Sequence, residues 1–215
     1  MRVADLGCGT GELTRELHEQ LAAEETIGID NSEAMLRKAT SSETLHFELG
    51  DIAGFTSDRP FDLIFSNAAL HWVPDHERLF ARLASMLTPD GQLAVQMPAN
   101  HDHPSHRIAA ELALSFGISS ALNVLPPERY ASLLHRLGFK RQHVRLQVYG
   151  HVLPSTADVV EWTKGSTLTP YRDALPQVRY EEFLAEYTSR VIEALGDEQP
   201  YFYTFKRVLM WAGRS

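Results

Sequence analysis

The sequence predicts an α/β fold with a mainly parallel sheet, and three observations lead to this prediction. Short apolar runs of strand length alternate with longer stretches in which apolar residues recur at helical spacing. Each of the first three apolar runs ends at or near an aspartate. A glycine-rich turn, residues 7–11, separates the first run from the first helical pattern. These features are typical of a doubly wound sheet with a ligand site at the carboxyl ends of its strands.

The glycine turn follows a strand that carries Asp5, and it contains Gly7, Gly9 and Gly11. Glycine lets the main chain bend sharply and approach a ligand, because it has no Cβ atom. The third glycine comes one residue too early for the dinucleotide fingerprint, and no Gly-Lys-Ser/Thr of a phosphate loop follows. Glu12, which opens the helix, would repel phosphate. A ligand with a positive group is therefore favoured over a phosphorylated one.

Two further strands also end near acids. The apolar run Thr26–Asp30 places Asp30 about 20 residues after the turn, where an acid can bind ribose hydroxyls. The next run, Leu45–Leu49, is followed by Asp51. Parallel strands bring their carboxyl ends to one edge of a sheet, so these acids should meet there. A ribose site and a cation site without a phosphate site describe S-adenosylmethionine (SAM), which we expect as cofactor, with S-adenosylhomocysteine as its product.

Four segments follow one another in order: Val3–Gly11, Gly28–Leu36, Gly50–Ile52 and Phe61–Asn67. In this order and spacing they resemble the successive motifs of class I SAM-dependent methyltransferases. The resemblance implies a Rossmann-like, doubly wound sheet of seven strands, mixed because the last strand is antiparallel. It also implies a helical cap insertion, which we expect at residues 155–198 of a single domain that spans residues 1–215. Such enzymes usually carry upstream lid helices, and we expect these to be missing here.

The resemblance implies roles for individual residues. The methionine end of SAM would be held by Asp5, Gly7, Gly9 and Gly11, the ribose by Asp30, and the adenine by Asp51 with Ile52. Ser32 and Met35, at the start of the second helix, are candidates for an adenine contact. A helix cap for Ser32 and core packing for Met35 are equally open alternatives.

Periodicity predicts the remaining elements. Helices are expected at Glu12–Ala23, Glu33–Ala39, His76–Leu87, Arg107–Phe116 and Tyr130–Leu137, and further strands at Phe61–Ser66, Leu93–Met97, Lys140–Leu153 and Tyr203–Met210. A turn is expected at Thr88–Gly91. The loop after the fourth strand should face the ligand crevice, so Asn67, His71 and Trp72 should border the transferring methyl group. They would position the reactants without an obligatory base, although His71 could act as donor or base and Trp72 as a hydrophobic plug.

Further segments resemble the trans-aconitate 2-methyltransferase family: Asn67–His76, Gln96–Asn100, Pro104–His106 and Glu161–Tyr171. This resemblance implies a methyl ester formed on a small (poly)carboxylic acid such as trans-aconitate. A carboxylic acid with a pKa of about 4 is ionised at neutral pH and needs no base. His71 departs from the glutamine that is common in this family, which leaves the identity of the acceptor open.

A polycarboxylate requires positive charge or several hydrogen-bond donors. The candidate residues for acceptor binding are Trp162, Lys164, Tyr171, Arg172, Tyr201 and Arg207. For the cations the open alternative is a solvated surface position, and for the aromatic residues it is core packing. The histidines His101, His103 and His106 lack the carboxylate partners of known metal patterns, so we expect a loop or a substrate-facing rim and no metal.

Composition limits the possible partners and compartment. The net charge is −8 and basic residues are not clustered, which disfavours nucleic acid. The single Cys8 fits a reducing compartment, and the absence of a signal peptide or a long apolar run predicts a cytoplasmic protein without membrane partners. Two alternatives stay open: methylation of malonyl-acyl carrier protein, which the acidic charge disfavours because that partner is itself acidic, and a SAM-binding module without catalysis.

Overall fold

The computed structural model describes residues 1–118 and 123–215, and the chain divides into two compact units. Within the described residues, the first unit comprises residues 1–98, 123–147 and 207–215, and the second comprises residues 99–118 and 148–206. The expected arrangement of one domain with a cap at residues 155–198 stays a prediction.

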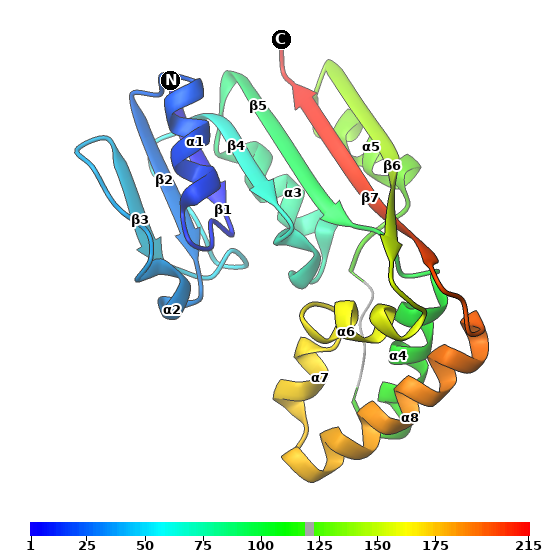
Figure 1. The fold of residues 1–215 in the computed structure, drawn as a ribbon. Helices are drawn as coiled ribbons and strands as arrows, with labels where there is room; N and C mark the ends of the chain where they lie inside the picture. The colour runs from blue at the N-terminus through cyan, green and yellow to red at the C-terminus, as the bar shows by residue number, and fades with distance from the viewer. Residues whose placement is uncertain (119–122) are drawn as a thin grey trace. The chain divides into compact units, whose positions relative to one another are not determined.

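A seven-stranded sheet runs through the protein in the order β3-β2-β1-β4-β5-β7-β6 (Figure 1). Its strands are β1 (Arg2–Leu6), β2 (Glu25–Asp30), β3 (Leu45–Leu49), β4 (Phe61–Asn67), β5 (Leu87–Pro98), β6 (Arg141–Leu153) and β7 (Tyr201–Gly213). Strands β1 to β5 pair in parallel, and β7 is antiparallel to β5. The predicted Rossmann-like mixed sheet with a reversed last strand is therefore confirmed.

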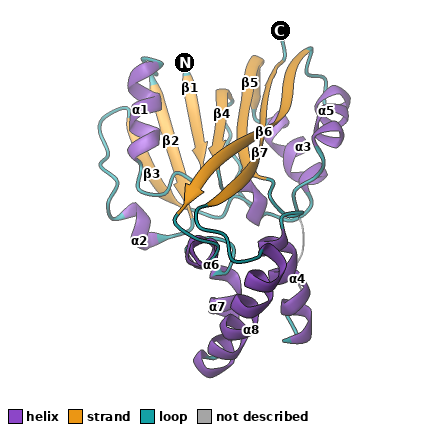
Figure 2. Ribbon diagram, turned by 45° about the vertical axis from the view of Figure 1, so that its right-hand side comes forward, coloured by secondary structure: helices purple, strands orange, loops and turns teal. Residues whose placement is uncertain are grey.

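Strand β1 lies in the middle of this sheet and is apolar because both of its faces are covered. Val3, Ala4 and Leu6 have no exposed surface. Helix α1 (Glu12–Gln20) covers one face, and helices α3 (His76–Ser85) and α5 (Pro127–Arg136) cover the other (Figures 1 and 2). The short α2 (Glu33–Leu36) follows β2, and the 3-10 helix η1 (Leu70–Trp72) follows β4.

Four helices make up most of the second unit: α4 (Pro104–Ser115), α6 (Ala157–Lys164), α7 (Thr169–Ala174) and α8 (Gln177–Leu195) (Figure 2). Helix α8 buries Tyr180, Phe183, Tyr187 and Val191, which recur at the spacing of one helical face. The described helices include none with both the length and the apolar character needed to cross a membrane.

Several predicted boundaries are wrong, and the largest error concerns Thr88–Gly91. These residues belong to β5 and do not form a separate turn before it. The pairing with β4 shifts between Phe61 and Leu63, so the extra residues are taken up as a bulge inside the strand. Helix α4 also begins earlier than expected, at Pro104, because His103 serves as its N-cap and proline suits the first turn.

The contact between α3 and α5 depends on a buried polar pair. His76 is 3% exposed, and its Nε2 lies 3.0 Å from the main-chain oxygen of Leu70. Nε2 therefore carries a proton, and Nδ1 of the neutral ring accepts the hydroxyl of Tyr130 at 2.5 Å. The amide of Leu125 donates to the same hydroxyl at 3.1 Å. Burial lowers the pKa of His76, which keeps this ring neutral.

We expect Tyr130→Phe to lower the free energy of unfolding by about 2 kcal/mol, because it leaves His76 Nδ1 and the Leu125 amide unpaired inside the protein. Urea denaturation of the wild type and the variant measures this difference. A double-mutant cycle with His76→Gln should show coupling between the two positions. A loss below about 0.5 kcal/mol would contradict the assigned hydrogen bonds.

Candidate active site

The glycine turn between β1 and α1 is attached to the end of β2 by main-chain hydrogen bonds. The amides of Gly7 and Cys8 both donate to the Ile29 oxygen, at 2.7 and 3.0 Å. The φ angles of Gly7, Gly9 and Gly11 are 83°, 57° and 75°, in the left-handed region that residues with a Cβ atom rarely adopt. The shape of the turn therefore requires glycine.

Asp30, the last residue of β2, holds the turn through its carboxylate. Oδ2 accepts from the Gly9 amide at 2.8 Å, and Oδ1 accepts from the Ser32 amide at 2.9 Å. Ser32 in turn caps α2, with its Oγ accepting from the Met35 amide at 3.4 Å. A carboxylate offers about four lone-pair sites, so two remain for a ligand.

A cavity of about 510 Å³ opens at the carboxyl ends of β1 to β4, within the first unit. Its lining comes from the four loops that follow these strands: Gly7, Gly9, Asp30, Asn31, Ser32, Met35, Asp51, Ile52, Ala53, Ala68, Ala69, Trp72, Val73 and Pro74. Asp30 and Asp51 thus lie at one edge of the sheet. The volume is in the range of small-molecule and cofactor sites, which is about 300–1,000 Å³.

The two glycines that line this cavity differ in their surroundings. A Cβ atom on Gly7 would lie 2.0 Å from Cβ of Ala69, so Gly7 is required by the approach of the loop after β4. A Cβ atom on Gly9 would meet nothing within 4 Å. Gly9 therefore leaves its main chain open toward the cavity, where a ligand can approach closely.

The lining residues fit a nucleoside with a positive group. Asp30 has free acceptor sites for ribose hydroxyls, and Met35 and Trp72 offer apolar surface at 44% and 54% exposure. Asp51 is exposed, with one oxygen accepting from the Ala53 amide at 2.9 Å. The described lining includes two carboxylates and neither lysine nor arginine, which suits a sulfonium and does not suit a phosphate.

Asp5 lies beneath the turn, where it is 2% exposed and its Oδ2 accepts from Thr14 Oγ1 at 2.6 Å. Burial raises the pKa of Asp5 to about 6, with a smaller contribution in the same direction from Asp30, while the Thr14 hydrogen bond opposes the rise. Asp5 thus supports the turn from inside. Its predicted contact with the methionine end of SAM stays a prediction, as does that of Gly11, which is the N-cap of α1.

The loop after β4 carries the residues predicted at the methyl-transfer point. Asn67 ends β4, and Trp72 lines the cavity. The ring centroids of His71 and Trp72 are 4.4 Å apart. Burial lowers the pKa of His71 to about 4, and nearby His76 adds to this effect. His71 is therefore neutral at pH 7, which suits a hydrogen-bond donor.

Comparison with known proteins identifies the family. A family model described as a methyltransferase domain matches residues 1–131. The chain belongs to this methyltransferase family. The trans-aconitate 2-methyltransferase of Deinococcus radiodurans is 42% identical over 226 residues, covering 99% of this chain and 86% of that protein. The enzyme of the same name from Variovorax paradoxus is 42% identical over 205 residues, covering 90% and 78%.

Solved structures share the fold. A phosphoethanolamine N-methyltransferase of Haemonchus contortus in complex with SAM has a TM-score of 0.62 at 17% identity; the alignment covers all of this chain, which spans 48% of that one. The YcgJ protein of Bacillus subtilis has a TM-score of 0.64 at 18% identity, covering 99% of this chain and 91% of that one. This methyltransferase is a SAM-dependent enzyme.

The residues predicted to bind the acceptor come from both units. In the second unit, Tyr171 is 7% exposed and packs on Phe183 in the helical core. Trp162 is 37% exposed, and Tyr201 is 9% exposed with its hydroxyl 3.2 Å from His103 Nε2.

The cationic candidates have partners of their own. Lys164 forms an ion pair with Glu161 at 2.6 Å, and Arg172 forms one with Asp173 at 3.1 Å. Arg207 belongs to the first unit, opposite Pro98 in the sheet. Their role in acceptor binding stays a prediction.

Several residues that line the cavity were not among those predicted from the sequence. Ala68 and Ala69 follow Asn67 directly, and small residues at this point are needed because Ala69 lies over Gly7. Val73 and Pro74 follow Trp72, and Asn31 follows Asp30. All of these residues adjoin a predicted site residue in the sequence, and this adjacency could have identified them.

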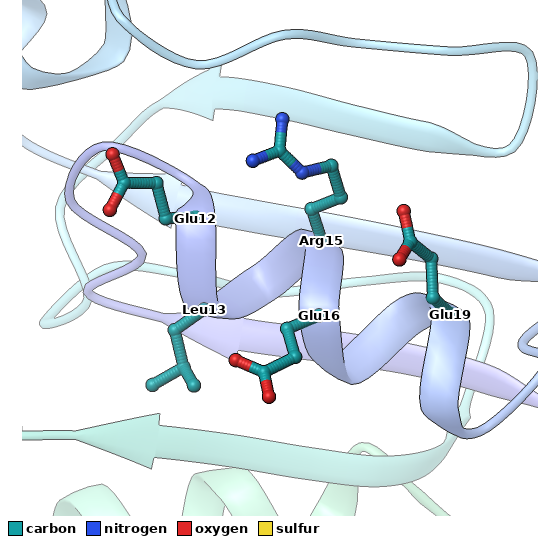
Figure 3. A pocket seen from close by; sticks show the side chains of 5 residues that line it. All are labelled: Glu12, Leu13, Arg15, Glu16 and Glu19. Carbon is teal, nitrogen blue, oxygen red and sulfur yellow. The ribbon is translucent and has the colours of Figure 1, made fainter.

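A second hollow, of about 490 Å³, runs along α1 (Figure 3). Its walls are Glu12, Leu13, Arg15, Glu16 and Glu19, all from this one helix. It is the solvent face of an amphipathic helix, so we assign no site to it. Residues 1–118 and 123–215 contain no group of three or more His, Cys, Asp or Glu side chains able to hold a metal.

We expect Gly7→Ala and Gly9→Ala to separate stability from SAM binding. Both replacements force an alanine into a positive φ, which costs about 1–2 kcal/mol each. Only the alanine at position 7 also collides with Ala69, so Gly7→Ala should lower the melting temperature further. Gly9→Ala should instead weaken SAM binding, because its methyl group would occupy space beside the cavity that a bound ligand needs. Calorimetry measures this loss of affinity. Equal SAM affinity in Gly9→Ala and wild type would contradict this role.

We expect Asp5→Asn to stabilise the protein at high pH only. The folded state raises the pKa of Asp5 to about 6, so ionisation above that pH disfavours the folded state. The penalty is absent below the pKa of the unfolded chain and develops as pH rises through about 6. Asp5→Asn should therefore raise the free energy of unfolding by about 2 kcal/mol at pH 8 and leave it nearly unchanged at pH 4. Urea denaturation at both pH values measures this, and an equal effect at both would overturn the assignment.

Proposed function

We propose that the protein transfers the methyl group of SAM to a carboxylate of trans-aconitate or a closely similar small polycarboxylic acid, forming a methyl ester. The observation that carries this proposal is the 42% identity to a trans-aconitate 2-methyltransferase over 99% of the chain. The likeness extends through both units.

The chemistry of the acceptor agrees with the residues near the methyl-transfer point. When bound, SAM supplies an electrophilic methyl group on a positively charged sulfur, which a carboxylate oxygen displaces in line. The carboxylate is already ionised at neutral pH, so no side chain has to remove a proton. His71 is a weak base here, because burial lowers its pKa to about 4. An amine acceptor, by contrast, would need a group able to accept a proton near neutral pH.

The proposed reaction assigns a role in cofactor or acceptor binding to each group of residues. The Gly9 main chain and the Asp30 carboxylate position the nucleoside, and the two carboxylates of the lining favour the positive sulfur over its neutral product. Trp72 excludes water from one wall. The residues of the second unit, Trp162, Lys164, Arg172 and Tyr201, remain candidates for the acceptor, together with Arg207.

The direct test is incubation with methyl-labelled SAM and trans-aconitate, followed by mass spectrometry. We expect a monomethyl ester and an equal amount of S-adenosylhomocysteine. Asp30→Asn should weaken SAM binding at least tenfold, because it removes a charged acceptor beside the ribose site. Glu48→Gln, an exposed acid on the neighbouring strand, removes the same charge and should leave SAM binding unchanged.

Other outcomes point to the alternatives. Methylation of malonyl-acyl carrier protein but not of free acids would replace the proposed acceptor. Bound SAM without methylation of any acid or carrier protein would indicate a SAM-binding module without catalysis.

A further inference from the structure

The carboxyl ends of β4 and β5 hold a polar side chain with nothing to bind. Both polar atoms of the Gln96 amide, Nε2 and Oε1, are buried and have no hydrogen-bond partner among the described residues. Buried amides are almost always paired, because an unpaired amide has lost its water without a replacement. The partner of the Gln96 amide therefore has to come from outside the described chain, as water or as a bound ligand.

A second unpaired atom belongs to the same corner of the sheet. Nδ1 of His71 is also buried and lacks a partner within the described chain. Gln96 and Asn67 are register partners, and the main-chain oxygen of Gln96 accepts from the Ala68 amide at 2.9 Å. This bond fixes the start of the loop that carries η1, and η1 in turn lies against β5. The unpaired atoms of Gln96 and His71 therefore sit on two elements that contact each other.

This corner adjoins the cavity. Ala68, whose amide binds the Gln96 main chain, is a lining residue. Trp72, whose indole lies 4.4 Å from the His71 ring, is another. In a doubly wound sheet the group that reacts with the cofactor is expected at these strand ends.

We propose that Gln96, together with His71, binds a carboxylate of the methyl acceptor, so that Gln96 is a specificity-determining residue of the transfer. This inference rests on the proposed function. The Gln96 Nε2–H donates to a carboxylate oxygen, and the His71 ring donates from Nδ1 in its neutral Nδ1–H form. The Gln96 Oε1 atom accepts from a water molecule at the carboxylate.

Neutral donors suit the reaction. Two uncharged N–H groups orient a carboxylate without the charge neutralisation that an arginine would bring, so the attacking oxygen keeps its electron density. The lowered pKa of His71, about 4, supports its neutral role at working pH.

Gln92 provides a matched control on the same strand and the same face, four residues earlier. Its Oε1 accepts from Trp211 Nε1 at 2.8 Å, so its side chain has a structural partner. Gln92→Leu should lower the melting temperature and leave the KM for trans-aconitate unchanged.

Gln96→Leu should raise the KM for trans-aconitate without lowering the melting temperature, since leucine removes an amide that has no partner among the described residues. We expect an unchanged or higher melting temperature and a KM for trans-aconitate raised about 10- to 100-fold, with the KM for SAM within about twofold.

A second pair of variants tests His71 independently of Gln96. His71→Gln keeps a neutral donor and should retain most of the affinity for trans-aconitate, whereas His71→Leu should raise the KM about tenfold or more. This pair keeps the proposal open to refutation if Gln96→Leu fails to fold.

The results separate this inference from the proposed function. An active wild type with an unchanged KM in Gln96→Leu, or with the same change in Gln92→Leu, overturns the inference alone. If the wild type forms no ester, calorimetry with trans-aconitate on the protein saturated with S-adenosylhomocysteine gives the answer. Binding that Gln96→Leu abolishes supports the inference and refutes the reaction. Absence of binding to the wild type overturns both.

Discussion

The candidate site depends on the attachment of the glycine turn to the end of β2. The Ile29 oxygen receives two amides from the turn, and the Asp30 carboxylate receives a third. These bonds are possible only because β1 and β2 are parallel neighbours that end at the same edge of the sheet. Since the turn has almost no side chains, its position is set by the strands on either side and not by its own packing.

Close packing around the turn limits what the neighbouring loops can be. Ala69 approaches Gly7 so closely that position 7 has no room for a side chain, so the loop after β4 lies directly against the turn. Gly11 is similarly enclosed, because a Cβ atom there would lie 2.6 Å from the Phe47 ring of β3. Three parts of the chain thus converge on one short segment: the end of β2, Phe47 in β3 and the loop after β4. The cavity opens beside this segment.

The sequence predicted this edge of the sheet well because its signals are local. An apolar run that ends in an acid indicates both a strand and the side chain at its end, as for Asp30 and Asp51. Prediction failed where the outcome depends on a distant partner. Thr88–Gly91 has the composition of a turn, but pairing with β4 draws it into β5 as a bulge. The burial of Asp5 and its hydrogen bond from Thr14 likewise depend on packing that no local pattern shows, while its contact with the methionine end of SAM stays a prediction.

Gln92 and Gln96 show most clearly what sequence alone leaves undetermined. They are the same residue type on the same face of one strand, and no local pattern distinguishes them. Trp211 of β7 donates a hydrogen bond to the side-chain amide of Gln92, whereas the side-chain amide of Gln96 is buried without a partner among the described residues. A chain selected for stability alone would favour an apolar residue at position 96, since an unpaired amide there opposes folding. The presence of such a group on the strand next to the candidate site is explained if its partner is the molecule that the enzyme binds.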